Sequence, residues 1–497
     1  FLVFLHRWLG IALCVLFLIW FPSGIAMMYW GYPDVTVADR LERAPALEPR
    51  SVRLSAAEAY ATLGLDGSPD RVRLASFDGR PVYRFAEGTV YADTGEEQVE
   101  VSTLMVRRIA SAWTRQPAHE AAVARVEELD QWTVQQNLGA VAPLWKFSWP
   151  NGEQVYVSQA TGEVEQYTTT ASRIGAYLGP IPHWFYITPL RKHGPEWSRV
   201  VIWSSGIGTF AAILGIVVGA WMYSPSKRYR RDGAPSAIPY HGQKRWHMVL
   251  GLVFGLATVT WAFSGMLSMD PFPTERGGPR PGDRPDIPQA LRGEMQFAAF
   301  AAKHPARALT ELAGRQVKQL EFACFAGEPL YLATLGDGTT RIVPLDAGPR
   351  ETFDRTRIAD VITAVAPSAS TRVIDQYDRY YLDRRRERPL PVMLVELNDE
   401  EHSRYYIDPA TARVVGSYSD ANWVGRWLYN GLHSFNFPWL YNYRPLWDIV
   451  VIAFMLGGTA LSVTSLVLAW RFIGRKLRRP VPGATRRRMS DDLALAD

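Results

Sequence analysis

The chain alternates long apolar runs with longer polar stretches. Four runs each hold about 20 or more predominantly apolar residues, which is the length a helix needs to cross the hydrocarbon core of a bilayer. They lie at 1–30, 197–223, 246–269 and 446–472. This pattern predicts four transmembrane helices. We interpret the first run as a membrane anchor rather than a signal peptide, because it has no clear small-residue cleavage site.

Two large polar segments, 31–196 and 270–445, lie between these runs. The stretch "LSAAEAYATLGL" (54–65) has the period of a short helix, and other stretches alternate apolar and polar residues as half-buried strands do. Turn residues typical of hairpins interrupt these strands around Gly88, Gly162, Gly338 and Thr411. We therefore predict a membrane α-helical protein with two α+β domains, each built from two small helix-plus-hairpin units.

The two halves of the chain repeat one another. Shifted by 241 positions, the first apolar run matches the third at His6/His247, Gly10/Gly251, Trp20/Trp261 and Ser23–Gly24/Ser264–Gly265. Shifted by 250 positions, the later part of the first half matches the second at Tyr156/Tyr406, Val164/Val414, His183/His433, Trp197/Trp447 and Gly208/Gly458. These matches indicate an internal duplication of one unit, in which a domain is flanked by two membrane helices.

Basic residues concentrate in two short regions, the loop at 224–245 and the tail at 473–497. Because Lys and Arg in short loops mark the cytoplasmic side of a membrane, we expect both regions and both termini in the cytoplasm. The two large polar segments then face the opposite side. The net charge of +5 is modest, and membrane topology accounts for the basic clusters, so no nucleic-acid partner is predicted.

The histidines are the candidate functional residues. Of nine in the chain, only His6/His247 and His183/His433 occupy equivalent places in both halves. A single histidine in a membrane segment can equally well be a helix-packing or interfacial residue as a functional one. However, ionisable groups in membranes are costly and usually functional. Two facing neutral imidazoles are what a six-coordinate haem iron requires. We therefore predict two b-type haems, one ligated near each membrane face, with no separate catalytic side chain.

Two further features bear on this prediction. Gly10 and Gly251 lie one helical turn from His6 and His247, where a macrocycle needs room, although helix packing also favours such glycines. The chain has two cysteines, Cys14 and Cys324, and no C-x-x-C-H or H-E-x-x-H motif. Covalent haem attachment, iron–sulfur clusters and zinc proteolysis therefore have no support.

Several motifs resemble the PepSY-associated transmembrane proteins of bacterial inner membranes. They are "HRWLG" with "SG" in the first run, "HMVLGL" with "FSGM" in the third, "SQATG" at 158–162, and "GLHSFNFPW" at 431–439. The second hairpin departs from the pattern, with Ala412 where glycine is usual. The family includes FoxB-like reductases of ferric siderophores. The resemblance implies PepSY-like domains in the periplasm and His6, His247, His183 and His433 as axial haem ligands.

The function expected from these features is a di-haem b oxidoreductase that passes electrons across the inner membrane to a periplasmic ferric siderophore and releases ferrous iron. No flavin or nicotinamide domain is visible, so the electron donor is expected to be separate, on the cytoplasmic side or in the membrane. Two alternatives stay open. One is a non-enzymatic PepSY protein that binds peptides or regulates proteases, and the other is a siderophore transporter.

Aromatic and basic residues flank the outer histidines and are candidate contacts for an acceptor. They are Trp184, Tyr186, Arg191, Lys192, Tyr441, Tyr443 and Arg444. Anchoring at the membrane interface is an equally good explanation for them. The basic run "DRRRER" (383–388) is a second candidate for attracting an anionic chelate, and its simpler interpretation is a solvated loop.

Overall fold

The computed structural model describes residues 1–65, 67–231, 233–271, 285–383 and 386–477. The described residues form two compact units. The helical unit draws on 1–31, 177–271 and 428–477, and the sheet-rich unit on 32–176 and 285–427. Most of the Pro/Gly-rich stretch after the third run, the centre of the "DRRRER" run and most of the basic tail lie outside the described residues.

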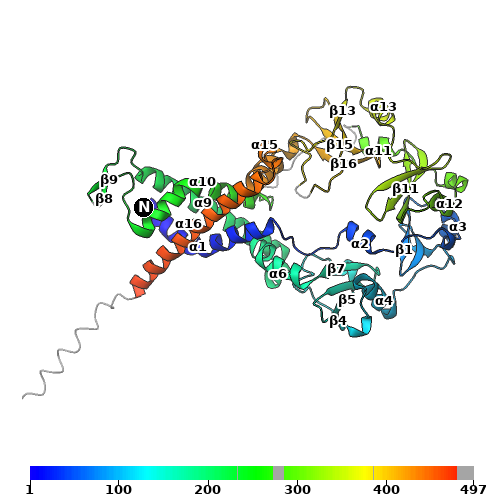
Figure 1. Cartoon of the computed structure of the whole chain (residues 1–497), viewed down its shortest axis with the longest axis horizontal. Coiled ribbons are helices and arrows are strands. Elements are labelled where there is room, and N and C mark those ends of the chain that lie inside the picture. Colours follow the sequence, from blue (N-terminus) through cyan, green and yellow to red (C-terminus); the bar gives the residue numbers. More distant parts are fainter. Residues whose placement is uncertain (66, 232, 272–284, 384–385, 478–497) are drawn as a thin grey trace, which may run out of the picture. The chain divides into compact units, whose positions relative to one another are not determined.

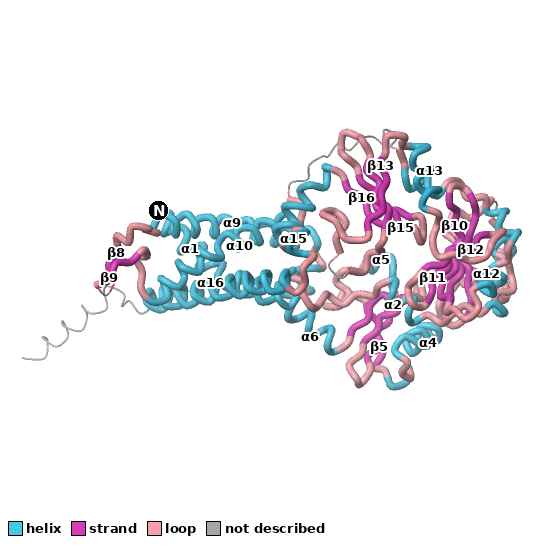
Figure 2. Tube along the Cα trace, turned by 45° about the horizontal axis from the view of Figure 1, so that its top comes forward, coloured by secondary structure: helices cyan, strands magenta, loops and turns pink. Residues whose placement is uncertain are grey.

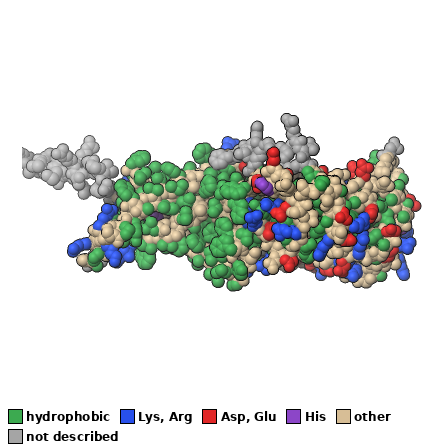
Figure 3. All heavy atoms as spheres, turned by 90° about the horizontal axis from the view of Figure 1, so that it is seen from above, with side chains coloured by type: hydrophobic (Ala, Val, Ile, Leu, Met, Phe, Trp, Pro, Cys, Tyr) green, Lys and Arg blue, Asp and Glu red, His purple; other side chains and the backbone are tan. Residues whose placement is uncertain are grey.

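Four long helices form the helical unit (Figures 1 and 2). They are α1 (Leu2–Met27), α9 (Gly194–Met222), α10 (Gly242–Leu267) and α16 (Leu446–Leu477). Each is long and apolar enough to cross a membrane. α1 packs against α9 and α16, and α10 packs against the same two helices. Figure 3 shows hydrophobic side chains covering the face of this bundle that is in view, as expected for helices that face lipid.

Short elements connect the long helices within the same unit. α7 (Pro180–Trp184) and α8 (Thr188–Arg191) precede α9, while α14 (Leu432–Ser434) and α15 (Pro438–Tyr441) precede α16 in the corresponding order. A small hairpin of β8 (Tyr229–Arg231) and β9 (Ala234–Ser236) lies in the connection between α9 and α10. Both outer histidines are on these short connecting helices, and both inner histidines are on the long ones.

The sheet-rich unit contains two similar antiparallel four-stranded sheets. One has β4 (Ala122–Val126), β5 (Leu144–Ser148), β6 (Gln154–Ser158) and β7 (Val164–Thr168) in sequential order. The other has β13 (Ser370–Ile374), β14 (Val392–Glu396), β15 (Arg404–Asp408) and β16 (Arg413–Tyr418). The helices of this unit are α2 (Val37–Arg43), α3 (Ala56–Ala61), α4 (Thr103–Thr114), α5 (Leu138–Val141), α6 (Thr170–Leu178), α11 (Ile287–Arg292), α12 (Pro305–Glu311) and α13 (Arg355–Val365).

A third sheet joins the two halves of the chain. Its six strands follow the order β12-β11-β10-β1-β2-β3. Their bounds are β1 (Val72–Phe77), β2 (Arg80–Arg84), β3 (Thr89–Tyr91), β10 (Val317–Phe325), β11 (Glu328–Leu335) and β12 (Thr340–Pro344). β1 and β10 pair antiparallel, and Val72 lies opposite Phe322, 250 positions further along the chain. Equivalent strands thus meet as in a two-fold symmetric dimer.

This shared sheet differs from the two separate domains that the sequence predicts. The local pattern was informative, since each half does contain a helix with three strands followed by a helix with four. However, the first of these units in each half would leave a strand edge unpaired, and pairing β1 with β10 satisfies those backbone groups. Leu74 and Leu320 are opposite one another and fully buried in one core that draws on both halves.

The hairpin in which alanine replaces the usual glycine keeps the same backbone turn. Gly162, between β6 and β7, has a φ of +68°, and Ala412, between β15 and β16, has a φ of +51°. A left-handed conformation costs an L-residue about 1–2 kcal/mol. The second half therefore has the same turn at some cost in stability.

Candidate functional site

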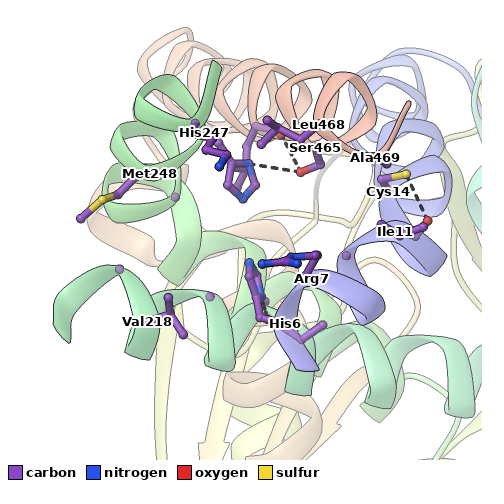
Figure 4. A pocket seen from close by; sticks show the side chains of 18 of the residues that line it. His6, Arg7, Ile11, Cys14, Val218, His247, Met248, Ser465, Leu468 and Ala469 are labelled. Carbon is purple, nitrogen blue, oxygen red and sulfur yellow. Dashed lines mark hydrogen bonds between the residues drawn. The ribbon is translucent and has the colours of Figure 1, made fainter. Parts of the chain in front are cut away.

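The inner histidine pair lies within the bundle, near the start of two long helices. His6 is on α1 and His247 is on α10, and their ring centroids are 6.2 Å apart with the ring planes at 36°. Figure 4 shows the two side chains pointing into one cavity from opposite sides. The helical unit thus brings together two residues that are 241 positions apart in the sequence.

Hydrogen bonds orient both inner imidazoles. The Nδ1 atom of His6 lies 3.1 Å from the carbonyl oxygen of Ala211, which can only accept, so Nδ1 carries the proton. The Nδ1 atom of His247 lies 3.2 Å from the Thr464 hydroxyl. That hydroxyl donates to the carbonyl of Leu461, so it accepts from Nδ1. In both residues Nε2 is therefore the unprotonated nitrogen, able to bind a metal.

The outer histidine pair repeats this arrangement outside the long helices. His183 is on α7 and His433 is on α14, with ring centroids 6.1 Å apart and ring planes at 69°. Burial lowers the pKa of both imidazoles below its usual value, so both are neutral at pH 7. Neutral imidazole is the form that binds iron.

The two Ser–Gly pairs that match in the repeat both lie against the outer histidines. Ser23 Oγ lies 3.1 Å from His183 Nδ1, and Ser264 Oγ lies 3.0 Å from His433 Nδ1. Each hydroxyl donates to a carbonyl of its own helix, so each accepts from the imidazole. A Cβ atom on the following residues, Gly24 and Gly265, would be in ordinary van der Waals contact with the imidazole Cε1, at 3.5 and 3.6 Å, so these helix positions lie directly beside the two rings.

A matched aromatic contact fixes the backbone beside each outer histidine. Phe185 and Phe435, two positions after the histidines, both adopt the left-handed conformation, with φ of +54° and +51°. Their rings pack against Trp20 and Trp261, which match one another in the repeat, at centroid distances of 5.8 and 5.2 Å. Strained backbone of this kind is found where the surrounding packing holds a functional residue in place.

A cavity of about 570 Å³ lies between the four long helices at the inner pair. This volume is in the range of roughly 300–1,000 Å³ typical of cofactor sites. His6, His247, Gly10, Gly215 and Gly251 line it, together with apolar side chains. A Cβ atom on Gly10 would meet nothing within 4 Å, so the position predicted to leave room does open onto space.

The geometry of both pairs fits an iron held between two imidazoles. A metal–imidazole bond is about 2 Å long and the ring centre lies about 1 Å from its nitrogen, so ring centres on opposite sides of one ion are roughly 6 Å apart. The two measured separations, 6.2 and 6.1 Å, agree with this value. No cluster of three or more His, Cys, Asp or Glu occurs among the described residues, whereas a six-coordinate haem takes only two protein ligands.

Several of the candidate acceptor contacts near the outer pair are already engaged within the protein. The Arg191 guanidinium stacks on Tyr186 and Trp197, and Arg444 forms an ion pair with Asp448. Tyr441, predicted as a contact, is only 3% exposed. Trp184 packs on Tyr186, Tyr443 is exposed, and Lys192 follows α8. These contacts favour interface anchoring over a binding role.

Three residues of the sites were not found by sequence reasoning: Thr464, Tyr429 and Ser465, whose Oγ lies 3.4 Å from His247 Nδ1. Thr464 has Leu214 at the equivalent place, so a comparison of the halves passes over it. Tyr429 stacks on His433 with centroids 5.5 Å apart, and its counterpart is Gly179. Tyr429 belongs to a π-helix, Val424–Gly431. Such helices are rare and occur at functional sites, but the sequence carried no signal for one here.

Comparison with protein families gave one match. The family model of the PepSY-associated TM region matches residues 3–308 and, separately, residues 244–493. The two matches together extend over nearly the whole chain, and each begins within the first residues of a histidine-bearing long helix, α1 or α10. Neither the comparison with curated proteins nor the comparison with solved structures gave a match.

Proposed function

The chain belongs to the PepSY-associated transmembrane family, and from that premise we propose that it is a di-haem b oxidoreductase of the bacterial inner membrane. It would pass electrons from the cytoplasmic side to a ferric siderophore in the periplasm. The observation that carries the proposal is the presence of two facing histidine pairs with iron-compatible separations. The haems, when bound, would supply the one-electron redox chemistry.

The spacing of the two pairs suits transfer across a bilayer. His6 and Ser23, which contacts the outer pair, are 17 residues apart on α1, and His247 and Ser264 are 17 residues apart on α10. At about 1.5 Å per residue this corresponds to roughly 25 Å along each helix. A hydrocarbon core is about 30 Å thick, so one pair would lie near each face of the membrane.

The polar groups around the imidazoles favour a reducing site. Each Nδ1–H donates to an oxygen atom, which increases the electron density on the imidazole and stabilises the ferric state of a bound iron. A more stable ferric state means a lower midpoint potential and a stronger one-electron reductant. The protein residues hold the ligands in one tautomer and need no proton transfer for this task.

The direction of transfer rests on the distribution of positive charge. The connection between α9 and α10 carries Lys227, Arg228, Arg230 and Arg231, which favours a cytoplasmic location for this end of the bundle. The inner pair is at the same end, because His247 follows this connection directly. The outer pair and the sheet-rich unit would then be periplasmic.

A ferric siderophore is the acceptor that we propose, by resemblance to the FoxB-like reductases. Hard oxygen ligands hold ferric iron far more tightly than ferrous iron. One electron delivered to the ferric chelate would give ferrous iron and release it from the ligand. No acid or base from the protein is needed for this step.

Haem content of single variants tests the cofactor assignment. Purified wild-type protein should contain two haems per chain by the pyridine haemochrome method, and His183→Ala or His433→Ala should contain about one. His402→Ala is the matched control, because His402 is exposed and pairs with Asp420 in the sheet-rich unit. A colourless wild-type protein would favour the peptide-binding alternative, and full haem content in both outer variants would contradict the ligand assignment.

Reoxidation kinetics test the acceptor. The protein would be reduced anaerobically with dithionite, freed of excess reductant and mixed with a ferric hydroxamate or catecholate siderophore and a ferrous chelator. Each chain should yield up to two ferrous ions as the haem spectrum reoxidises, and His433→Ala should lose this reaction. Reoxidation by oxygen or a quinone alone, with every ferric chelate inert, would contradict the proposal. Uptake of the chelate into vesicles without a redox change would favour transport.

A further inference from the structure

The cavity at the inner histidine pair has an unbalanced charge. Four cationic side chains line it, Arg7, Lys244, Arg475 and Lys476, and no Asp or Glu is among the described residues of its wall. They come from the second turn of α1, the first turn of α10 and the last turn of α16, so they lie at one end of the cavity. In Figure 4, Arg7 extends toward the space between His6 and His247.

These cations have no carboxylate partner in the described part of the chain. Arg7 and Lys476 lie over the ring of Phe472, Lys476 also lies over Trp8, and Lys244 lies over Tyr240. Arg475 Nε donates to the carbonyl oxygen of Arg471. The outer end of the bundle differs, because Arg199 pairs with Glu196 and Arg444 pairs with Asp448. Four neighbouring positive charges repel one another unless an anion joins them.

The rest of the wall is apolar or small. Ile11, Leu13, Phe17 and Phe21 contribute apolar surface, and the glycines open space beside the imidazoles. An occupant that complements this wall has a broad apolar body and anionic groups on one edge. Haem b has this form, because both propionates extend from the same edge of the macrocycle.

We propose that Arg7, Lys244, Arg475 and Lys476 form a carboxylate-binding rim for the propionate edge of the inner haem. The inference rests on the proposed function, and it adds an orientation, with the propionates toward the cytoplasmic end and the apolar edge toward the centre of the bundle. Arg can bind a carboxylate through two parallel hydrogen bonds, and Lys acts as a point charge. All four side chains are exposed, so salt should weaken their effect.

The test compares haem with haem dimethyl ester, in which the propionates are uncharged. Full-length protein carrying His433→Ala, so that only the inner pair remains, would be purified without haem in nanodiscs and titrated with each compound. Hydrogen bonds to charged groups suggest that haem binds roughly tenfold more tightly than the ester or better. Arg7→Gln combined with Lys476→Gln should abolish this preference while leaving the affinity for the ester unchanged, which shows that the variant is folded.

Arg471→Gln is the matched control, because Arg471 is an exposed cation on the same helix that does not line the cavity. It should keep the full preference for haem, and high salt should reduce that preference in the parent. Equal affinities for haem and ester in the parent protein would contradict the proposed role of the rim without contradicting the assignment of the haem sites. If the rim variants instead lost co-purified anionic phospholipid, the rim would belong to lipid headgroups and the proposal would also be overturned. Failure of the parent to bind either compound would overturn the proposed function itself.

Discussion

Hydroxyl groups set the chemical form of three of the histidines, and His247 has two of them near Nδ1, those of Thr464 at 3.2 Å and Ser465 at 3.4 Å. Ser23, Ser264 and Thr464 each donate to a carbonyl of their own helix and accept from an imidazole Nδ1. In the interior of a helix the backbone N–H and C=O groups normally bond to one another. The hydroxyl of a serine or threonine is therefore the polar group that can still contact a neighbouring helix. These hydroxyl groups thus leave Nε2 as the available nitrogen in His183, His433 and His247.

Removal of one hydroxyl should loosen one site. Ser264→Ala takes the acceptor from His433 Nδ1, and loss of such an outer contact typically lowers affinity by roughly 10–100-fold. We expect the variant to lose the outer haem faster than wild type on dilution. In the fraction that still contains the outer haem, the midpoint potential of that haem should be higher than in wild type. Ser204→Ala is the control, since its hydroxyl donates to the carbonyl of Val201 on its own helix. Unchanged retention and potential in Ser264→Ala would show that the hydrogen bond has no role.

The angles between imidazole planes predict two different spectra. The inner planes are at 36° and the outer planes at 69°. Near-perpendicular axial imidazoles make the iron d orbitals almost degenerate, and more parallel ones separate them. Electron paramagnetic resonance of the oxidised protein should therefore show a strongly anisotropic signal and a rhombic one. His183→Ala should remove the first signal and leave the second, and the reverse outcome would contradict the geometry.

At the scale of the elements, close approach of α9 to α1 depends on one glycine. A Cβ atom on Gly215 would lie 2.7 Å from Cε1 of His6, too close for any real contact. The missing side chain lets the carbonyl of Ala211, one turn earlier on α9, reach Nδ1 of His6. The spacing of these two helices is thus part of the inner site.

Adding one methyl group should disrupt this spacing. Gly215→Ala should displace His6 and reduce the inner haem content by at least half, with the outer haem retained. Gly474→Ala on α16 is the control, because a Cβ atom there meets nothing within 4 Å. Haem quantitation and paramagnetic resonance would identify which site is lost. Full inner occupancy in Gly215→Ala would mean that the helices separate without affecting the ligand.

The elements also show what the sequence could predict. The four long helices follow from apolar runs that can be read locally, and the pairing of the histidines follows from the repeat. The pairing of β1 with β10 joins residues about 250 positions apart, and local alternation contains no information about such a partner. Thr464 was missed for a related reason, because only one half of the repeat has it.

At the scale of the whole molecule, the proposed direction of electron flow requires one topology. A reporter that is active only in the periplasm should be active when fused after Glu120 or Glu311, both in the sheet-rich unit. The same reporter should be inactive after Gly233, in the basic connection between α9 and α10. The positive-inside rule is the physical basis of this expectation. The opposite pattern would reverse the proposed direction of transfer as well.

The pairing of β1 with β10 also bears on how such a chain could arise. Half of this molecule, taken alone, would expose the edge of β1 and could cover it with the β1 strand of a second identical copy. The same copy would supply the second histidine of each pair. A fused chain keeps this assembly, but each half can then change separately. The outer site contains one such difference, because Tyr429 contacts His433 and the equivalent residue in the first half is Gly179. The two histidines of the outer pair therefore differ in their surroundings, as they could not in a symmetric dimer of identical subunits.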